Sequence, residues 1–260
     1  MKKGLRIGLV WALIALTVLL LILIGRGTDS VHAMKTCTGL DVEILDSLDL
    51  GFVTRADVKE IMDSDYGVYI GKRLDSLNLK KIENLMTGRS AILACEAFTT
   101  EDGLLHLHIT QRGPIVRFQA PDGGYYADET GYIFPLHPKY DSQVTLIQGD
   151  IPLVIPQGFK GEPATDGEKA WLEGIIGFVK TLNRDKKWNG AFSRIVCEKD
   201  GLVLYPAKGG ERFIFGGPDD FEAKLEKIEK YYTNIAPSRE EGYYKTVNLK
   251  YENQIICRRK

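Results

Sequence analysis

The sequence contains little cysteine and no excess of positive charge. Its 260 residues include four cysteines, and no two of them form a Cys-x-x-Cys pair, which argues against a zinc ribbon or a thioredoxin-type redox site. Lysine and arginine number 34 against 35 acidic residues, for a net charge of -1. Because nucleic-acid binding needs a cationic surplus or stripe, we expect no nucleic-acid partner.

Catalytic motifs are also lacking. The chain has no Gly-x-Ser-x-Gly, His-Glu-x-x-His, P-loop or Gly-x-Gly-x-x-Gly sequence, which are local patterns of hydrolases and nucleotide-binding proteins. His106 and His108 could hold one metal ion from the same strand face, but no further His or Cys lies nearby, so we interpret them as part of a solvated face. The Asp128-Glu129 and Asp219-Asp220 pairs are typical of a turn and a helix start. We therefore predict no enzymatic activity, no cofactor and no metal site.

A long hydrophobic run occurs once. Residues 7–25 contain no charged side chain and, as a helix, would span about 28 Å, close to the hydrocarbon thickness of a bilayer. Three basic residues precede the run, which predicts a cytoplasmic tail at residues 1–6 and an exported remainder. A cleaved signal peptide ending near Val31-His32-Ala33 is the alternative, but the run exceeds a usual signal-peptide core. We predict an uncleaved span followed by a linker at residues 26–36.

The exported part is predicted to be of the α+β class, with one domain at residues 37–116 and another at 117–260. Each domain contains two cysteines, so Cys37–Cys95 and Cys197–Cys257 could form disulfides in an oxidising compartment. Buried free thiols are the alternative, and we favour them.

The first domain has a β-α-α-β-β pattern. Thr54 opens the first helix with Asp57 three positions later, the spacing of a capping box. Asn78 opens the second helix and Gly88 closes it. Each helix carries an apolar stripe that would cover one face of a sheet. The predicted strands are Val42–Ile44, Ala91–Thr99 and Leu104–Thr110.

The second domain is predicted to be mostly antiparallel β structure with flanking helices. A capping-box sequence at Thr165–Glu168 starts one helix. Asp219-Asp220 starts another, whose apolar stripe includes Phe221, Leu225, Ile228 and Tyr232. The predicted strands are Tyr125–Ala127, Tyr132–Leu136, Val144–Gln148, Ile151–Ile155, Ala191–Glu198, Leu202–Pro206, Arg212–Phe215, Tyr244–Tyr251 and Gln254–Cys257.

The strand at Tyr244–Tyr251 lies near the end of the chain. Apolar and polar residues alternate along it, so one of its faces would be buried. A terminal strand is often a sheet edge with unpaired N–H and C=O groups, which can accept a strand from a partner. A position inside the sheet is the alternative.

Three stretches of the chain carry a resemblance to a known family. They are Ile109–Val116, Gly124–Leu136 and Val247–Cys257, and their order resembles that of the FtsQ/DivIB cell-division proteins found in Bacteroidetes. The resemblance covers nearly the whole chain. It implies a short cytoplasmic tail, a single membrane span, a POTRA domain and a C-terminal β domain.

The resemblance further implies a non-enzymatic scaffold of the divisome, the assembly that builds the division septum. Such a protein is held in the lipid bilayer of the inner membrane with its folded domains in the periplasm. Its β domain would bind FtsB, in complex with FtsL, by strand addition at the C-terminal edge. The POTRA domain would bind other divisome membrane proteins through the strand around Cys95. Two alternatives are a periplasmic POTRA-containing transport or assembly factor and a membrane-anchored cell-wall enzyme.

The implied FtsB/FtsL interface lies on the last strand region and the helix beside it. Tyr251 occupies the position of a tyrosine that contacts the partner in related proteins. The full set is Val247, Asn248, Leu249, Lys250, Tyr251, Glu252, Asn253, Gln254, Ile255, Ile256, Cys257, Phe221, Lys224, Leu225 and Ile228.

Overall fold

The computed structural model describes residues 14, 16–19, 35–46, 49–120, 123–240 and 242–259. The chain divides into two compact units between Gln111 and Arg112. Within the described ranges, no helix combines the length and the apolar character that a membrane span requires. The predicted tail at 1–6, most of the predicted span at 7–25 and most of the linker at 26–36 lie outside the described residues.

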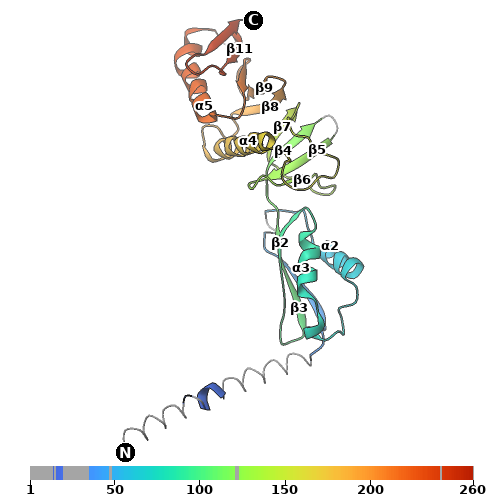
Figure 1. Cartoon of the computed structure of the whole chain (residues 1–260). Coiled ribbons are helices and arrows are strands. Elements are labelled where there is room, and N and C mark those ends of the chain that lie inside the picture. The colour runs from blue at the N-terminus through green and yellow to red at the C-terminus, as the bar shows by residue number, and fades with distance from the viewer. Residues whose placement is uncertain are drawn as a thin grey trace, which may run out of the picture. The chain divides into compact units, whose positions relative to one another are not determined.

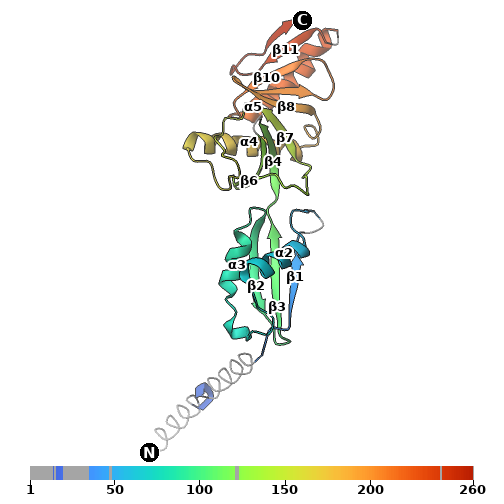
Figure 2. The ribbon, with the colours of Figure 1, turned by 90° about the vertical axis from the view of Figure 1, so that its right-hand side faces the viewer.

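The first unit is a three-stranded sheet with two helices on one face (Figures 1 and 2). The central strand pairs in parallel with the first strand and antiparallel with the second, in the order β1-β3-β2. The predicted β-α-α-β-β pattern is confirmed. The elements are β1 (Gly39–Ile44), α2 (Arg55–Ile61), α3 (Leu79–Thr87), β2 (Ile92–Thr99) and β3 (Leu104–Gln111).

Local hydrogen bonds explain where these helices begin. The Thr54 side chain accepts from the Asp57 N–H, and the Asp57 carboxylate accepts from the Thr54 N–H at 2.9 Å, so both halves of the capping box form. Asn78 caps α3 by accepting from the Lys81 N–H at 2.9 Å. Helix and sheet then bury a shared apolar layer, the main source of stability for short helices. The layer includes Val58, Met62, Ile82, Met86, Leu105, Leu107 and Ile109.

Among the described residues, the second unit has nine strands in one mixed sheet. Their order is β12-β11-β10-β9-β8-β7-β4-β5-β6. Five neighbouring pairs are antiparallel, as predicted for most of the domain, whereas β4-β7, β7-β8 and β10-β11 are parallel. The strands are β4 (Pro114–Ala120), β5 (Gly123–Asp128), β6 (Ile133–Pro135), β7 (Thr145–Gly149), β8 (Phe192–Glu198), β9 (Gly201–Pro206), β10 (Arg212–Gly216), β11 (Tyr244–Asn248) and β12 (Ile256–Arg259).

Two helices, α4 (Asp166–Arg184) and α5 (Phe221–Lys230), share one apolar core with this sheet. The predicted capping box forms at α4, because the Thr165 side chain and Glu168 exchange hydrogen bonds. The ring centroid of Phe178 in α4 lies 5.0 Å from that of Phe215 in β10 and 6.0 Å from that of Phe221 in α5. These aromatic contacts join both helices to the β10 side of the sheet.

Several details differ from the prediction. Ile151–Ile155 is not a strand, and Pro114–Val116 begins β4 in the second unit. Asp220 precedes α5 in a left-handed conformation, with φ of 45°, and its side chain makes no cap hydrogen bond. The buried tyrosine after α5 is Tyr231, not Tyr232. The chain becomes π-helical there, and this wider turn shifts the apolar stripe by one residue.

Candidate partner-binding edge

The last two strands form a hairpin, and only the outer one lies at the sheet edge. β11 pairs with β10 on one side and with β12 on the other. Of the two positions considered for the Tyr244–Tyr251 strand, an edge or the inside of the sheet, the structure has the second. Figure 1 shows this end of the sheet, which lies opposite β6 in the strand order.

A turn ends β11 earlier than predicted. The Leu249 N–H donates to the Ile214 carbonyl at 2.9 Å, and the Lys250 N–H donates to the Asn248 side chain at 3.0 Å. Lys227 of α5 donates to the carbonyls of Leu249 at 3.1 Å and Tyr251 at 2.6 Å. These bonds satisfy backbone groups that leave the ladder, so the chain can reverse and return as β12.

β12 is the edge strand at this side of the described sheet. Its register sets Ile256 against Asn248 and Cys257 against Val247. Because β12 has one neighbour, the backbone groups on its other side face no strand of the described chain. Tyr251 is 51% exposed and Ile256 is 38% exposed, so large apolar side chains accompany this open edge.

The structure separates the predicted interface residues into two groups. Exposed side chains follow the turn and the start of β12, whereas several others are part of the core. The exposed group is Lys250, Tyr251, Glu252, Asn253, Gln254 and Ile256. Val247, Leu249, Lys224, Leu225 and Ile228 are buried, and Asn248, Ile255, Cys257 and Phe221 are partly buried. The buried side chains can support the edge from behind but cannot contact a partner.

Lys224 shows this difference most clearly. It is 6% exposed, and its ammonium group donates to the carbonyls of Gly217 at 2.9 Å and Asp219 at 2.6 Å. The Asp219 carboxylate lies 3.3 Å away. Lys224 thus holds the turn before α5 and faces inward.

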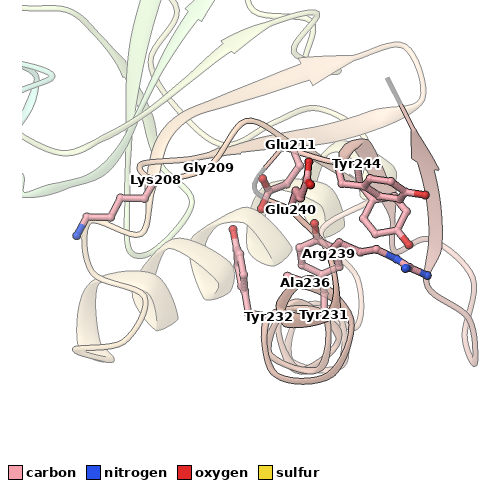
Figure 3. A pocket seen from close by; sticks show the side chains of 11 residues that line it. Lys208, Gly209, Glu211, Tyr231, Tyr232, Ala236, Arg239, Glu240 and Tyr244 are labelled. Atoms are coloured by element: carbon pink, nitrogen blue, oxygen red, sulfur yellow. The ribbon is translucent and has the colours of Figure 1, made fainter.

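Behind β11 lies a pocket of about 240 Å³, which the sequence analysis missed (Figure 3). Its walls carry Tyr231, Tyr232, Tyr243 and Tyr244, and the Glu211 carboxylate points into it. Burial together with the charge of Glu211 raises the pKa of Tyr231 to about 12. Tyr232 is 41% exposed as a whole, but desolvation of its hydroxyl and a hydrogen bond to Glu211 raise its pKa as well, so both hydroxyls stay protonated. The pocket could have been suspected from two pairs of adjacent tyrosines in the sequence, Tyr231-Tyr232 and Tyr243-Tyr244.

The first unit carries a polar sheet face, as predicted for the two histidines. His106 lies 3.1 Å from Asp41, and His108 lies 3.3 Å from Glu43. The Phe98 ring stacks on His106, with 5.0 Å between ring centroids. In the described part of the chain, no group of three or more His, Cys, Asp or Glu residues is arranged to hold a metal ion.

All four cysteines are free thiols, so neither candidate disulfide forms. Cys95 lies on β2, an edge strand of the first sheet. Its burial raises the pKa of the thiol to about 11, and burial likewise raises the pKa of Cys197 to about 11. Both thiols therefore remain protonated and poorly nucleophilic near neutral pH.

Two family models match the chain. The model described as FtsQ/DivIB, C-terminal related, matches residues 113–258, which is more than half of the chain. The model of a POTRA-like domain matches residues 35–110. No curated protein matches the sequence.

Proposed function

The chain belongs to the FtsQ/DivIB family of non-enzymatic cell-division scaffolds, and we propose that it recruits FtsB and FtsL to the divisome through β12. In this proposal residues 7–25 anchor the protein in the inner membrane at the septum. Residues 1–6 are cytoplasmic, and the two folded units are periplasmic.

The open edge of β12 is the observation that carries the proposal. An unpaired strand edge offers a row of hydrogen-bonding groups to an incoming strand, and nearby side chains select the sequence that binds. Here Tyr251 and Ile256 are exposed beside such an edge. A segment of FtsB, held in its complex with FtsL, would add to the sheet next to β12 and contact these two side chains.

The anchor and the edge act together in this mechanism. Confinement to the membrane raises the effective concentration of the scaffold for partners in the same membrane. The preformed sheet then orders a partner segment that has no stable structure alone. Neither step makes or breaks a covalent bond.

The POTRA-like unit offers a second contact for divisome membrane proteins. β2, which contains Cys95, lies at an edge of the three-stranded sheet. Leu93 on the same strand is exposed. We propose that this strand binds partners other than FtsB and FtsL, as a second strand-addition site.

Charged substitutions on the open edge test the main proposal. Full-length protein in detergent would be titrated with the FtsB/FtsL complex, and the affinity measured for Tyr251→Asp and Ile256→Asp. We expect each variant to bind at least about tenfold more weakly, because each places a charge in a desolvated contact. Val154→Asp is the matched control, since Val154 is 84% exposed outside this region. Unchanged affinity in both edge variants would refute strand addition at β12.

A further inference from the structure

One wall of the pocket behind β11 carries a buried carboxylate that lacks a described cation. Glu211 is 7% exposed, and its carboxylate accepts from the Gly210 N–H at 3.0 Å and from the Tyr232 hydroxyl. No cationic side chain pairs with it among the residues that the structure describes. Buried carboxylates are ordinarily paired with a positive charge, because neutral donors compensate only part of the lost hydration.

A second carboxylate shares the pocket with Glu211. Glu240 is exposed and likewise belongs to no ion pair in the described part of the chain. Both residues line the pocket, and Figure 3 shows their carboxylates pointing into the same part of it. Like charges that share a small space disfavour each other, so a cation between these two groups would stabilise both.

The cations near the pocket that the structure describes are directed elsewhere. The guanidinium groups of Arg239 and Arg259 lie 5.4 Å and 5.1 Å from the centre of the Tyr243 ring, and Arg239 is also hydrogen-bonded to Tyr244. Figure 3 shows the Lys208 side chain extending away from the two carboxylates. The pocket therefore has an aromatic side, which this chain fills with its own arginines, and an acidic side, where no described cation lies.

Two tyrosines complete the acidic side. Tyr231 and Tyr232 both line the pocket, with 5.2 Å between their ring centroids, and Tyr232 is 41% exposed. A primary ammonium group has three N–H donors, which matches two carboxylates and a tyrosine hydroxyl oxygen. Aromatic faces within about 6 Å also attract such a group, and the exposed Tyr232 ring offers an apolar surface to the alkyl chain that carries it.

The size of the pocket restricts its ligand further. Its volume is about 240 Å³, whereas sites for drug-sized ligands measure roughly 300–1,000 Å³. A slender aliphatic chain with an ammonium end suits this volume. An anionic ligand is excluded, because it would place a third negative charge beside Glu211 and Glu240.

We propose that the acidic side of this pocket binds the primary ammonium group of a small aliphatic amine. Glu211 and Glu240 would each accept one of its N–H groups, while the alkyl chain lies against the Tyr232 ring and leads out to solvent. The ligand is a free small molecule, so the proposal goes beyond the recruitment of FtsB and FtsL and does not rest on it.

Calorimetric titration with four probes tests the chemistry of the site. Full-length protein in detergent, at constant ionic strength, would be titrated with 1-pentylamine, 1,5-diaminopentane, 1-pentanol and tetramethylammonium chloride. We expect saturable binding of one molecule of either amine per chain. The alcohol and the quaternary ion should bind at least about tenfold more weakly, because the alcohol lacks the charge and the quaternary ion lacks N–H donors. Equal affinity for the quaternary ion would overturn the assignment to a primary ammonium group.

Substitutions in the pocket test its location. Glu211→Gln keeps the shape of the side chain and an acceptor for the Gly210 N–H, and it should weaken amine binding about tenfold, because a charge-assisted contact becomes a neutral one. Glu240→Gln, at an exposed position, should weaken binding several-fold and gives a second test if the buried substitution impairs folding. Glu222→Gln removes the same charge from an exposed position in the first turn of α5, and it should leave amine binding unchanged.

Three results would overturn the proposal. They are no saturable amine binding by the unaltered chain, unchanged binding by both Glu211→Gln and Glu240→Gln, and binding that appears only after Lys208 or Lys260 is replaced by glutamine. The last result would show that a lysine of this chain fills the site itself. None of them bears on β12, because that proposal is tested separately by the affinity of Tyr251→Asp and Ile256→Asp for FtsB/FtsL.

Discussion

The two edges of the nine-stranded sheet differ, because one is covered by another segment of the chain and the other is open. At one edge, Ile133 of β6 exchanges backbone hydrogen bonds of 2.8 and 3.0 Å with Gly161, and Pro135 has no N–H to offer. At the other edge, β12 faces no further strand of the described chain. Since an open edge invites pairing with any chain, covering one edge restricts partner addition to the other.

The covered edge is also the better buried of the two. Ile133 and Phe134 of β6 are fully buried, whereas Ile256 of β12 is exposed. The β6 edge is therefore part of the folded core, whereas the β12 edge stays open at the surface, as the proposed binding site requires. Substitutions near β6 should therefore change stability, and substitutions on β12 should change partner affinity.

The largest effect is expected for Asp128→Ala beside the covered edge. One oxygen of this buried carboxylate accepts from the Thr130 N–H at 2.8 Å, the Thr130 hydroxyl at 2.7 Å and the Tyr132 N–H at 3.0 Å. The other oxygen pairs with Arg112, whose side chain is 11% exposed. Alanine would leave this arginine without its carboxylate and the turn without its acceptor, so the free energy of unfolding should fall by about 3–5 kcal/mol.

Urea titration can measure this change. Tryptophan fluorescence reports on the second unit, because Trp171 and Trp188 lie there and the described part of the first unit has no tryptophan. Glu129→Ala, at the adjacent exposed position, is the control and should change little. A loss below about 1 kcal/mol in Asp128→Ala would mean that the β5-β6 turn does not depend on the carboxylate.

A smaller effect is expected for Lys224→Met near the open edge. The substitution keeps most of the side-chain volume but removes the donors to the carbonyls of Gly217 and Asp219. The second unit should lose about 1–3 kcal/mol of stability, while the affinity for FtsB/FtsL should stay unchanged. Weaker partner binding with unchanged stability would instead show that Lys224 contacts the partner, as the sequence analysis predicted.

The smallest effect is expected in the segment that covers β6. Glu168 accepts from the Val154 N–H at 2.7 Å and from the Thr165 hydroxyl at 2.7 Å. These hydrogen bonds lower the pKa of its carboxyl below the ordinary 4.5, and the bond from Val154 has the largest effect. Because the folded-state pKa is depressed, this stabilisation is present above the unfolded-state pKa and is lost as pH falls through the folded-state pKa.

Hydrogen exchange would test this pH dependence. After correction for intrinsic rates, the Gly161 amide should exchange faster as pH falls below 4.5 and through the depressed pKa of Glu168. In Glu168→Gln, the exchange should already be faster at neutral pH and should not accelerate further through this titration. The same acid response in both proteins would show that another carboxyl group holds the covering segment.

Much of the fold could be predicted because its signals are local. Three helices begin at caps whose hydrogen bonds span only three residues. The capping residues are Thr54 with Asp57, then Asn78, and then Thr165 with Glu168. Gly131 turns β5 into β6 with φ of 83°, a conformation that glycine adopts without strain. The family resemblance extended this reading to the cell-division scaffolds, and the family match confirms it.

The site was predicted less well because it depends on strand order. Alternation along Tyr244–Tyr251 indicated a strand with one buried face, but the same alternation occurs in an edge strand and in a strand that is paired on both sides. Of the four hydrogen bonds that end β11, three involve β10 or α5, which are more than 20 residues away in the chain, and one is local. Glu211 and Tyr244 are likewise distant in sequence and meet only at the pocket.

The sequence by itself determined the helices, the hairpins and the α+β class, because capping and apolar periodicity act over a few residues. Only the tertiary structure decided which strand is open to a partner, which lysine is internal and which carboxylate lacks a described cation. Those properties arise from contacts between distant segments, whose free energies depend on how the whole sheet is ordered.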